Sequence, residues 1–562
     1  MAIKHLLKPG ENNIEIKISS DDSRLKVSLY DTTFYDKYWI GLLVILILPL
    51  INLKSLRLDF ITYVSCNIKY YRKYLVVGIA MLILLITLTI LSYLVPDEPT
   101  IKVFIVIVFL GTFFFPAIIY VKEKMIHGKL TAVMYTFAII LLYCFLFRLP
   151  HDQYSYDING HLEYVRYLIN HGESPVATGG WLFYHPSLYY RIAALMYPVV
   201  NLANPYDDSE FGKYLQCLSG ALFAVYYFFG LKTIDLYFKT PNLNSPENVR
   251  KHIFIITAAI FLFWPSNNFI GVRAGNDILF DTLFSVAFYF ASKWWLTKQS
   301  LNLYIAIATC SLCVWAKTNG FIIYILLGFL LAIDLHRNRG VKNYVKQHKR
   351  QYVIFISAFL LTCYFSFHQK IEQWMIDPGT RLIVGNVNGL GANAIVQNKP
   401  LNYLFLNPVH FVETPFTDSF DDAKGRNYFW FFLLKSSMFG EFGFDDRTLQ
   451  LIAQIMSLFL LTFIPLTVIW GLRACLKCYK YGSIAILANF ATLLFMMIIF
   501  RIYYPYASSA DFRYIFPFLL PLAFVLGAGF AIIKNKAIRF VYQCFIAGFL
   551  FAGLCFQLVF IF

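Results

Sequence analysis

Long apolar runs, separated by short polar stretches, follow one another along most of the chain. The runs 75–95, 101–121 and 451–472 approach or exceed the roughly 20 residues that a helix needs to cross the hydrocarbon core of a bilayer. Backbone N–H and C=O groups in lipid must pair within their own segment, so runs of this length indicate helices. The pattern therefore predicts an all-α protein that crosses a membrane many times.

By the same length criterion, the chain carries about 13 to 14 transmembrane helices. The predicted spans are 75–95, 101–121, 129–149, 211–238, 253–270, 277–297, 302–316, 320–335, 353–369, 451–473, 482–503, 512–533 and 540–560, and the shorter run 38–53 either crosses or lies in the membrane. Two long polar segments, 150–210 and 370–450, interrupt this series, and we expect them to be loops that carry short amphipathic helices.

These patterns divide the chain into five parts. They are a polar amino-terminal segment (1–37), a membrane extension (38–128), a membrane core (129–369) that includes the first loop, the second loop (370–450), and carboxy-terminal transmembrane helices (451–562). Within the first part, residues 14–30 alternate in polarity and predict a small hairpin, to which we attach no function.

Composition and charge support the membrane interpretation. The chain is 59% hydrophobic and 14% charged, and its net charge is +16. The basic residues gather in short clusters between apolar runs, at 54–73, 122–129, 336–350, 473–480 and 534–539. Such clusters are typical of cytoplasmic loops rather than of a nucleic-acid-binding face. They place both long loops together on the outer side of the membrane, and we expect no nucleic-acid partner.

Cysteine usage indicates neither structural disulfides in these loops nor a metal site. None of the ten cysteines falls in 150–210 or 370–450. Cys475 and Cys478 form a CxxC pair, but a zinc site needs a full set of ligands, so the pair alone is a weak signal.

The first loop contains the best candidate for a general base. If the residues after Asp157 are helical, Asp157, His161 and Tyr164 share one helix face, because their spacing is i, i+4 and i+7. A carboxylate and an imidazole at the membrane rim could then meet a polar acceptor, and burial there could tune the carboxylate pKa. The alternatives are that Asp157 only caps the helix and that His161 is an ordinary hydrogen-bonding side chain.

Aromatic side chains follow in the same loop and could stack on sugar rings. Trp181, Tyr184 and His185 precede Pro186, which is typical of the start of a helix, and we expect that helix to end before Asn204. Together with Tyr164, these side chains are candidates for sugar or acceptor binding. The alternative for Trp181 is a place in the aromatic belt of the membrane interface.

Five cations lie at outer membrane edges, where the positive-inside rule disfavours them. They are Arg273, Lys317, Lys435, Arg501 and Arg513. A lipid phosphate at the membrane surface could pair with them through charge-assisted hydrogen bonds, which arginine can make in bidentate form. The alternative partners are Asp277, Glu441, Asp511 or phospholipid headgroups.

Several short motifs between about residues 129 and 533 together resemble one family. They are Asp157, Gly172, Trp181 and His185-Pro186 in the first loop, Asn276-Asp277 at the head of a span, Lys317 within 316–320, residues 434–441 in the second loop, and Asp511, Arg513 and Tyr514 before a proline-containing helix. In this order they resemble the GT-C superfamily of polytopic glycosyltransferases. The closest likeness is to the branch of protein O-mannosyltransferases and lipid A aminoarabinose transferases. Ile158 stands where this family commonly has the Glu of an Asp-Glu pair, so Asp152 remains the alternative base.

The resemblance implies a glycosyltransferase that uses a polyprenyl-phosphate sugar. Asp157 would then act as base in an inverting transfer to a protein, lipid or glycan acceptor on the outer face, and Lys317 and Arg513 would hold the donor phosphate. No nucleotide-binding motif appears, which fits a lipid-borne donor. No cofactor is implied with certainty, and the need for a divalent cation stays open. The alternatives are a flippase or transporter of lipid-linked sugars and an oligosaccharide polymerase or ligase. We expect a multi-pass protein of a bacterial cytoplasmic membrane, or of the endoplasmic reticulum in a eukaryote.

Overall fold

A computed structural model describes residues 125, 128–155, 157–177, 179–201, 208–239, 247–337, 341–376 and 394–561. The predicted hairpin at 14–30 and the predicted spans 38–53, 75–95 and 101–121 lie outside these residues.

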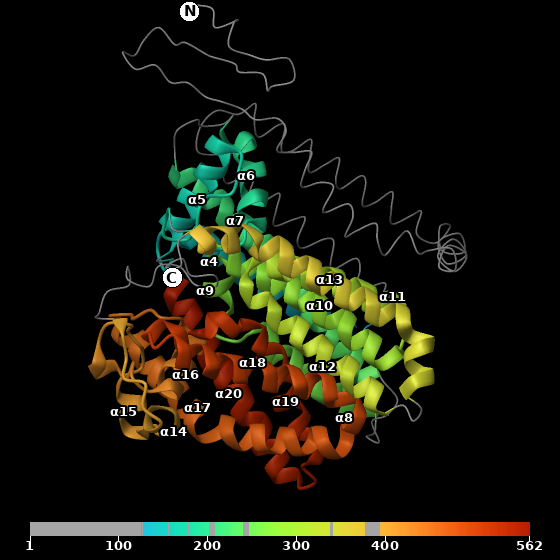
Figure 1. Ribbon diagram of the computed structural model, residues 1–562. Helices are drawn as coiled ribbons and strands as arrows, with labels where there is room; N and C mark the ends of the chain where they lie inside the picture. Colours follow the sequence, from blue (N-terminus) through green and yellow to red (C-terminus); the bar gives the residue numbers. More distant parts are fainter. Residues whose placement is uncertain are drawn as a thin grey trace, which may run out of the picture.

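Helices make up most of the described chain (Figure 1). They are α4 (Gly128–Arg148), α5 (Ile158–His171), α6 (Leu188–Asn201), α7 (Asp208–Lys239), α8 (Glu247–Leu262), α9 (Asn267–Gly271), α10 (Asn276–Thr297), α11 (Ser300–Ala316), α12 (Phe321–Arg337), α13 (Val341–Ile376), α14 (Leu401–Leu404), α15 (Pro408–Glu413), α16 (Phe429–Phe439), α17 (Arg447–Ala474), α18 (Ile484–Tyr503), α19 (Leu519–Gly529) and α20 (Lys536–Ile561). The described residues contain no strand beyond one isolated antiparallel bridge between Ile395 and Tyr506. The prediction of an all-α fold is confirmed for this part of the chain.

Seven helical segments in the described residues are long and apolar enough to cross a membrane. Arg447–Thr462 and Ile464–Tyr479, which are bent relative to each other, form an eighth if they cross as one span. The seven are Leu130–Arg148, Phe211–Lys239, Thr318–Arg337, His348–His368, Ile484–Tyr503, Ala507–Ile532 and Lys536–Ile561. Helices α8, α10 and α11 lie at predicted spans, but each is too short or too polar to meet the same criterion. These lengths and compositions are consistent with a polytopic membrane protein.

The predicted span 253–270 is wrong in its boundaries, because α8 ends at Leu262 and the short α9 follows. Pro265 explains the break, since proline has no backbone N–H and restricts the residue before it. The Asn267 side-chain amide donates to the carbonyls of Phe261 (2.8 Å) and Leu262 (3.0 Å) and thereby satisfies two groups that the helix leaves unpaired. The break directs the next turn of chain, which carries Arg273, toward the loops.

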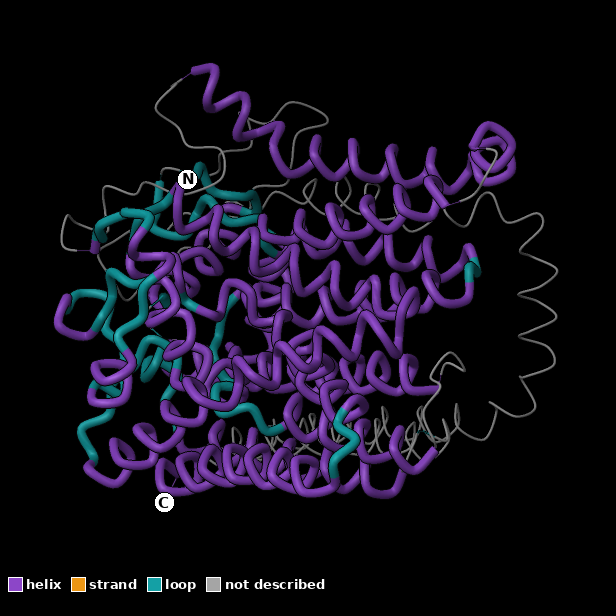
Figure 2. Tube along the Cα trace, turned by 90° about the horizontal axis from the view of Figure 1, so that it is seen from below, coloured by secondary structure: helices purple, strands orange, loops and turns teal. Residues whose placement is uncertain are grey.

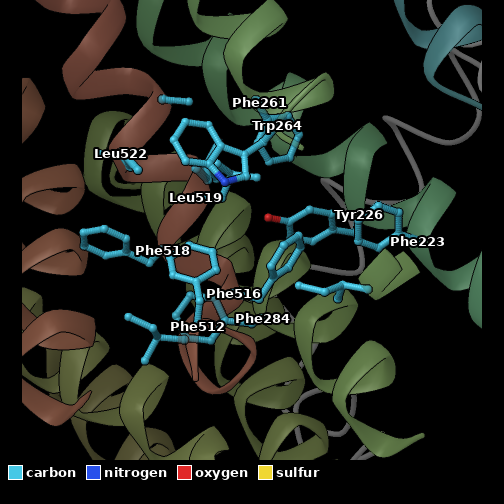
Figure 3. Packing of buried hydrophobic residues seen from close by; sticks show 14 of the residues in the cluster. Phe223, Tyr226, Phe261, Trp264, Phe284, Phe512, Phe516, Phe518, Leu519 and Leu522 are labelled. Carbon is cyan, nitrogen blue, oxygen red and sulfur yellow. The ribbon is translucent and has the colours of Figure 1, made fainter. Parts of the chain in front are cut away.

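The predicted helix 512–533 also differs, because it opens as the 3-10 helix η8 (Phe512–Phe518) and becomes α-helical only in α19. Large rings anchor this opening turn in the interior (Figure 3). The Phe516 ring lies 5.7 Å from that of Phe223 and 5.5 Å from that of Tyr226, both on α7. This packing fixes the position of the residues just before and within η8, which include Asp511 and Arg513.

The two long loops meet at one end of the helices. Figure 2 shows helices running side by side with most of the loop gathered toward one end, and Figure 1 shows α5, α6 and α14 to α16 on the same side of the molecule. The Tyr154 ring lies 5.0 Å from that of Phe442 and 5.5 Å from that of Phe444. Lys370 Nζ donates to the carbonyl of Tyr184 (2.6 Å). Residues of the two predicted loops therefore form one layer.

Thiol labelling tests the membrane side of this layer. We expect an impermeant thiol reagent to label Asn170→Cys and Ala423→Cys in intact cells, because both positions are exposed and belong to the loops without basic clusters. Ala537→Cys, in the basic cluster 534–539, should react only after the membrane is opened. Native cysteines are replaced beforehand. Labelling of only one of the two loop positions in intact cells would contradict the shared outer side.

Candidate functional site

Asp157 lies at the amino-terminal end of α5, yet its side chain makes no capping hydrogen bond. Its Oδ2 instead accepts from Arg513 Nη1 at 3.0 Å and from Arg273 Nη2 at 3.2 Å. The carboxylate is therefore turned toward two cations from distant parts of the chain. The capping alternative does not account for this orientation.

The local backbone holds both arginines in place. Arg273 follows α9, in the turn that Pro265 and the break after α8 bring to the loop layer. Arg513 lies in the first turn of η8, where its backbone N–H donates to Asp511 Oδ1 at 3.1 Å. Its Nε lies 3.2 Å from Asp511 Oδ2, so the same carboxylate fixes both the backbone and the guanidinium.

Glu441 completes this arrangement from the second loop. Gly440 ends α16 with a φ of 67°, a left-handed conformation that favours glycine, and turns the chain so that Glu441 faces the arginines. Glu441 Oε1 lies 3.6 Å from Arg513 Nη2 and 3.9 Å from Arg273 Nη1. The sequence suggested Glu441 only as an ion-pair partner, and its place at the end of the motif 434–441 was the one signal that pointed to it.

We call these five residues, Asp157, Arg273, Glu441, Asp511 and Arg513, the arginine–carboxylate cluster. Its three carboxylates differ in access, since the side chain of Asp157 is 25% exposed, whereas those of Glu441 and Asp511 are 6% and 2% exposed. Of the three carboxylates, Asp157 is the one that an incoming hydroxyl group could reach most easily.

The charges of the cluster determine its protonation. Burial raises the pKa of Asp157, but the guanidinium groups of Arg513 and Arg273 outweigh burial and hold this pKa well below its usual range. Burial raises the pKa of Glu441 to about 7, although the same arginines oppose the shift. Asp157 is thus ionised at neutral pH, whereas Glu441 can change its protonation near neutral pH.

A second charged group lies beside the cluster. Lys317 forms an ion pair with Asp277, and its Nζ lies 4.8 Å from the centre of the Tyr514 ring. The hydroxyl of Tyr514 accepts from Arg513 Nη2 at 3.2 Å. Tyr514 therefore connects Lys317 with the arginine–carboxylate cluster.

His161 and Tyr164 share the buried face of α5 as predicted, where they hold α5 against α6. His161 Nδ1 lies 3.0 Å from the Tyr190 hydroxyl, and the Tyr164 ring stacks on the Tyr190 ring at 3.8 Å. The turn before α10 comes so close to His161 that a Cβ at Gly275 would lie 2.8 Å from Nε2. Burial lowers the pKa of His161 to about 4, so the imidazole is neutral at neutral pH and adds no cation to the site.

A cavity of about 310 Å³ opens next to Lys317, between α12 and α18. Its polar wall contains side chains from the first loop and from the segments around Lys317 and Tyr514, and its apolar wall comes mainly from the two helices. The residues that line it include Tyr184, His185, Lys317, Phe321, Met497, Phe500 and Tyr514. Two of the predicted sugar-binding residues, Tyr184 and His185, thus lie on the same cavity as a predicted phosphate-binding lysine.

Other predicted site residues lie elsewhere. Arg501 donates to the carbonyls of Ala507 and Arg426, each at 3.0 Å, and so joins two backbone segments. The side chain of Trp181 is 43% exposed, and Asp152 is exposed on the surface of its loop.

Lys435, on α16, has a buried side chain whose partners lie outside the cluster. Its Nζ donates to the carbonyl of Thr414 at 2.8 Å and to Ser457 Oγ at 3.0 Å, and burial lowers its pKa to about 6. These contacts use its donor groups within the protein. The described residues contain no group of three or more His, Cys, Asp or Glu side chains that could hold a metal ion.

No family model matches the chain, and no curated protein matches it either. The resemblance to the GT-C superfamily therefore remains a hypothesis, and the geometry of the site is the main basis for a proposal.

Proposed function

We propose that the protein transfers a sugar from a polyprenyl-phosphate donor to a hydroxyl group on the extracytoplasmic side of the membrane. In this reaction the acceptor hydroxyl loses its proton to Asp157, and its oxygen bonds to the anomeric carbon. The bond between that carbon and the phosphate oxygen breaks, its electron pair stays on the phosphate, and the configuration at carbon inverts. The polyprenyl phosphate is the leaving group.

The observation that carries this proposal is the cavity between α12 and α18. Thr318–Arg337 and Ile484–Tyr503, which include these helices, are both apolar enough to cross a membrane, so a lipid chain could enter between them. Phe321, Met497 and Phe500 supply apolar contacts for such a chain, while Lys317 stands at the polar wall. An apolar cavity with a cation at one side suits an amphipathic molecule with an anionic head.

The cluster beside the cavity suits the phosphate and the developing charge. Negative charge grows on the phosphate oxygen as the glycosidic bond breaks, and cations that are already in place stabilise it. Lys317 lines the cavity. Arg513 donates a hydrogen bond to the hydroxyl of Tyr514, which also lines the cavity. Asp157, bound to Arg513, is then close to the point where an acceptor would attack. Tyr184 and His185 line the wall where the sugar would lie.

A transporter or flippase is the alternative that one observation favours. Asp281 is fully buried on α10, and neither of its carboxylate oxygens has a hydrogen-bond partner among the described residues. Buried acids within membrane helices often belong to ion or proton pathways. The two proposals differ in outcome, since a transporter moves the intact lipid-linked sugar, whereas a transferase cleaves it.

The cavity gives a direct test of the donor site. We expect Met497→Trp to raise the KM for a polyprenyl-phosphate sugar by about tenfold or more, because the indole would displace part of the buried isoprenoid chain. It should also reduce crosslinking of a photoactivatable isoprenyl phosphate to α12 and α18. Phe495→Trp is the matched control, since Phe495 is 61% exposed on the same helix. Equal effects of the two variants, or crosslinks confined to other helices, would overturn the placement of the donor.

A further inference from the structure

The arginine–carboxylate cluster has more acids than cations. Three carboxylates, Asp157, Glu441 and Asp511, face two guanidinium groups, Arg273 and Arg513, in ion-pair contacts of 3.0 to 3.9 Å. Full ionisation would leave one excess negative charge in a largely buried site, which is costly. Neither His161, which is neutral, nor Lys317, which is paired with Asp277, supplies the missing cation.

Hydrogen-bond geometry identifies the carboxyl that is least stabilised as an anion. Asp157 accepts two charge-assisted hydrogen bonds at 3.0 and 3.2 Å. Asp511 accepts a backbone N–H at 3.1 Å. Glu441 lies beyond hydrogen-bond distance from both guanidinium groups, and among the described residues its side chain accepts a long hydrogen bond of 3.4 Å from Ser419 Oγ. The negative charge is therefore easiest to remove at Glu441.

The proposed donor phosphate would draw on Arg513, which contacts Tyr514 beside Lys317, and on Arg273, which shares Asp157 with Arg513. Both arginines already face carboxylates, so an incoming phosphate adds a fourth anionic group to two cations. Buried anions of like charge disfavour one another's ionisation, and a proton relieves the conflict. The group that can take this proton with the least loss of hydrogen bonding is Glu441.

We infer that Glu441 takes up a proton when the donor phosphate binds, so that the phosphate replaces it as the anionic partner of Arg273 and Arg513. This inference rests on the proposed function, because it assumes that the ligand is a lipid-linked phosphate. It makes Glu441 a positioning residue that sets the charge of the arginines, while Asp157 remains the base. It also predicts that the donor binds more tightly as the pH falls through neutrality.

The surroundings of Glu441 agree with this behaviour. The charged and titratable groups that face it among the described residues are Arg273 before α10, Arg513, Asp511 and Tyr514 at η8, and Asp157 at α5. Burial is the largest cause of its raised pKa, and the nearby carboxylates add to it. The carboxyl is therefore protonated below about pH 7 and competes with the phosphate above it.

The probe must not titrate in the same range. The second pKa of a phosphomonoester is about 6, whereas a phosphodiester has no second ionisation. An isoprenyl phosphodiester therefore keeps one negative charge over the whole pH range of the experiment. Titration calorimetry of the full-length protein in lipid discs, in two buffers of different ionisation enthalpy, gives the number of protons taken up per probe bound. Transfer from a lipid-linked sugar donor is measured in parallel.

We expect the wild type to take up close to one proton per diester at about pH 8, and its Kd to rise about tenfold between about pH 6 and about pH 8. Glu441→Gln mimics the protonated carboxyl, so it should bind the diester without proton uptake, with a Kd that stays near the low-pH value. Asp445→Asn is the matched control, because Asp445 is an exposed carboxylate four residues further along. It should behave as the wild type does.

The outcomes separate this inference from the proposed function. Wild-type binding without proton uptake overturns the inference, and the proposed function stands if transfer is still observed. Proton uptake that persists in Glu441→Gln overturns it as well, because the proton then sits on another group. Absence of both diester binding and transfer overturns the inference and the proposed function together. If Glu441→Gln does not fold, the two-buffer measurement on the wild type decides.

Discussion

Replacing Asp157 with Asn should lower kcat for sugar transfer by about a hundredfold or more, the effect expected for loss of a general base. The amide keeps the shape of the side chain but cannot accept a proton at neutral pH. Helix α5 should be unaffected, because the Asp157 side chain makes no capping hydrogen bond. The KM for the donor should stay constant or fall, since Arg273 and Arg513 lose one anionic partner and become freer to bind phosphate.

This division between kcat and KM distinguishes a base from a structural residue. Steady-state kinetics with donor and acceptor varied separately would measure it, alongside thermal unfolding. Asp152→Asn is the matched control, because Asp152 lies exposed in the same loop and is the alternative base from the sequence. Full activity in Asp157→Asn with inactivity in Asp152→Asn would reassign the base. A higher donor KM with an unchanged kcat in Asp157→Asn would instead indicate a binding role.

The second large effect is expected at Arg513. Under the proposed function, Arg513→Ala removes a charge-assisted contact to the donor phosphate worth about 1.5–3 kcal/mol, which corresponds to an expected loss of one to two orders of magnitude in turnover. Arg513→Lys should recover only part of the activity, because an ammonium group cannot contact Asp157 from one nitrogen of a planar fork and Glu441 and Tyr514 from another. The defect should appear in the donor terms of the rate equation, and acceptor affinity should barely change.

The same substitution has a structural cost that must be measured separately. Arg513 balances buried carboxylates, and removing one partner of a buried ion pair destabilises proteins by about 3–5 kcal/mol. Arg513→Lys keeps the charge and is therefore the informative variant if Arg513→Ala unfolds. Arg447→Ala, at an exposed position in the first turn of α17, controls for the loss of a surface cation. A defect of Arg513→Lys confined to the acceptor terms would refute its assignment to the donor phosphate.

Local features of the site could be predicted from the sequence because they depend on nearest neighbours along the chain. Apolar runs determine where helices form, and the 3.6-residue period places His161 and Tyr164 on one face of α5, with Asp157 directly before the helix. The break after α8 could also have been predicted, since Pro265 stood within the proposed span and disfavours a continuous helix.

The assembly of the cluster depends on contacts that no local pattern contains. Asp157, Arg273, Glu441 and Arg513 come from four separate segments, and only the packing of η8 and the break after α8 bring them together. Arg501 shows the converse, because it has the same residue type and a similar place at a helix end, but donates to backbone carbonyls. Residue type and membrane depth alone do not separate a cation that is available to a ligand from one that joins two loops.

Cleavage of a lipid-linked sugar with transfer on the outer face is the claim on which the other proposals depend, and a single transfer experiment measures both steps. Purified protein in lipid discs receives a polyprenyl-phosphate sugar labelled in the sugar, with lipid, glycan and protein acceptors offered separately, and a labelled nucleotide sugar serves as the competing donor. We predict that the label moves from the polyprenyl phosphate to one acceptor class, that unlabelled polyprenyl phosphate is released, and that Asp157→Asn abolishes both. Transfer from the nucleotide sugar without lipid, or movement of the intact donor across vesicle membranes without cleavage, would contradict the claim.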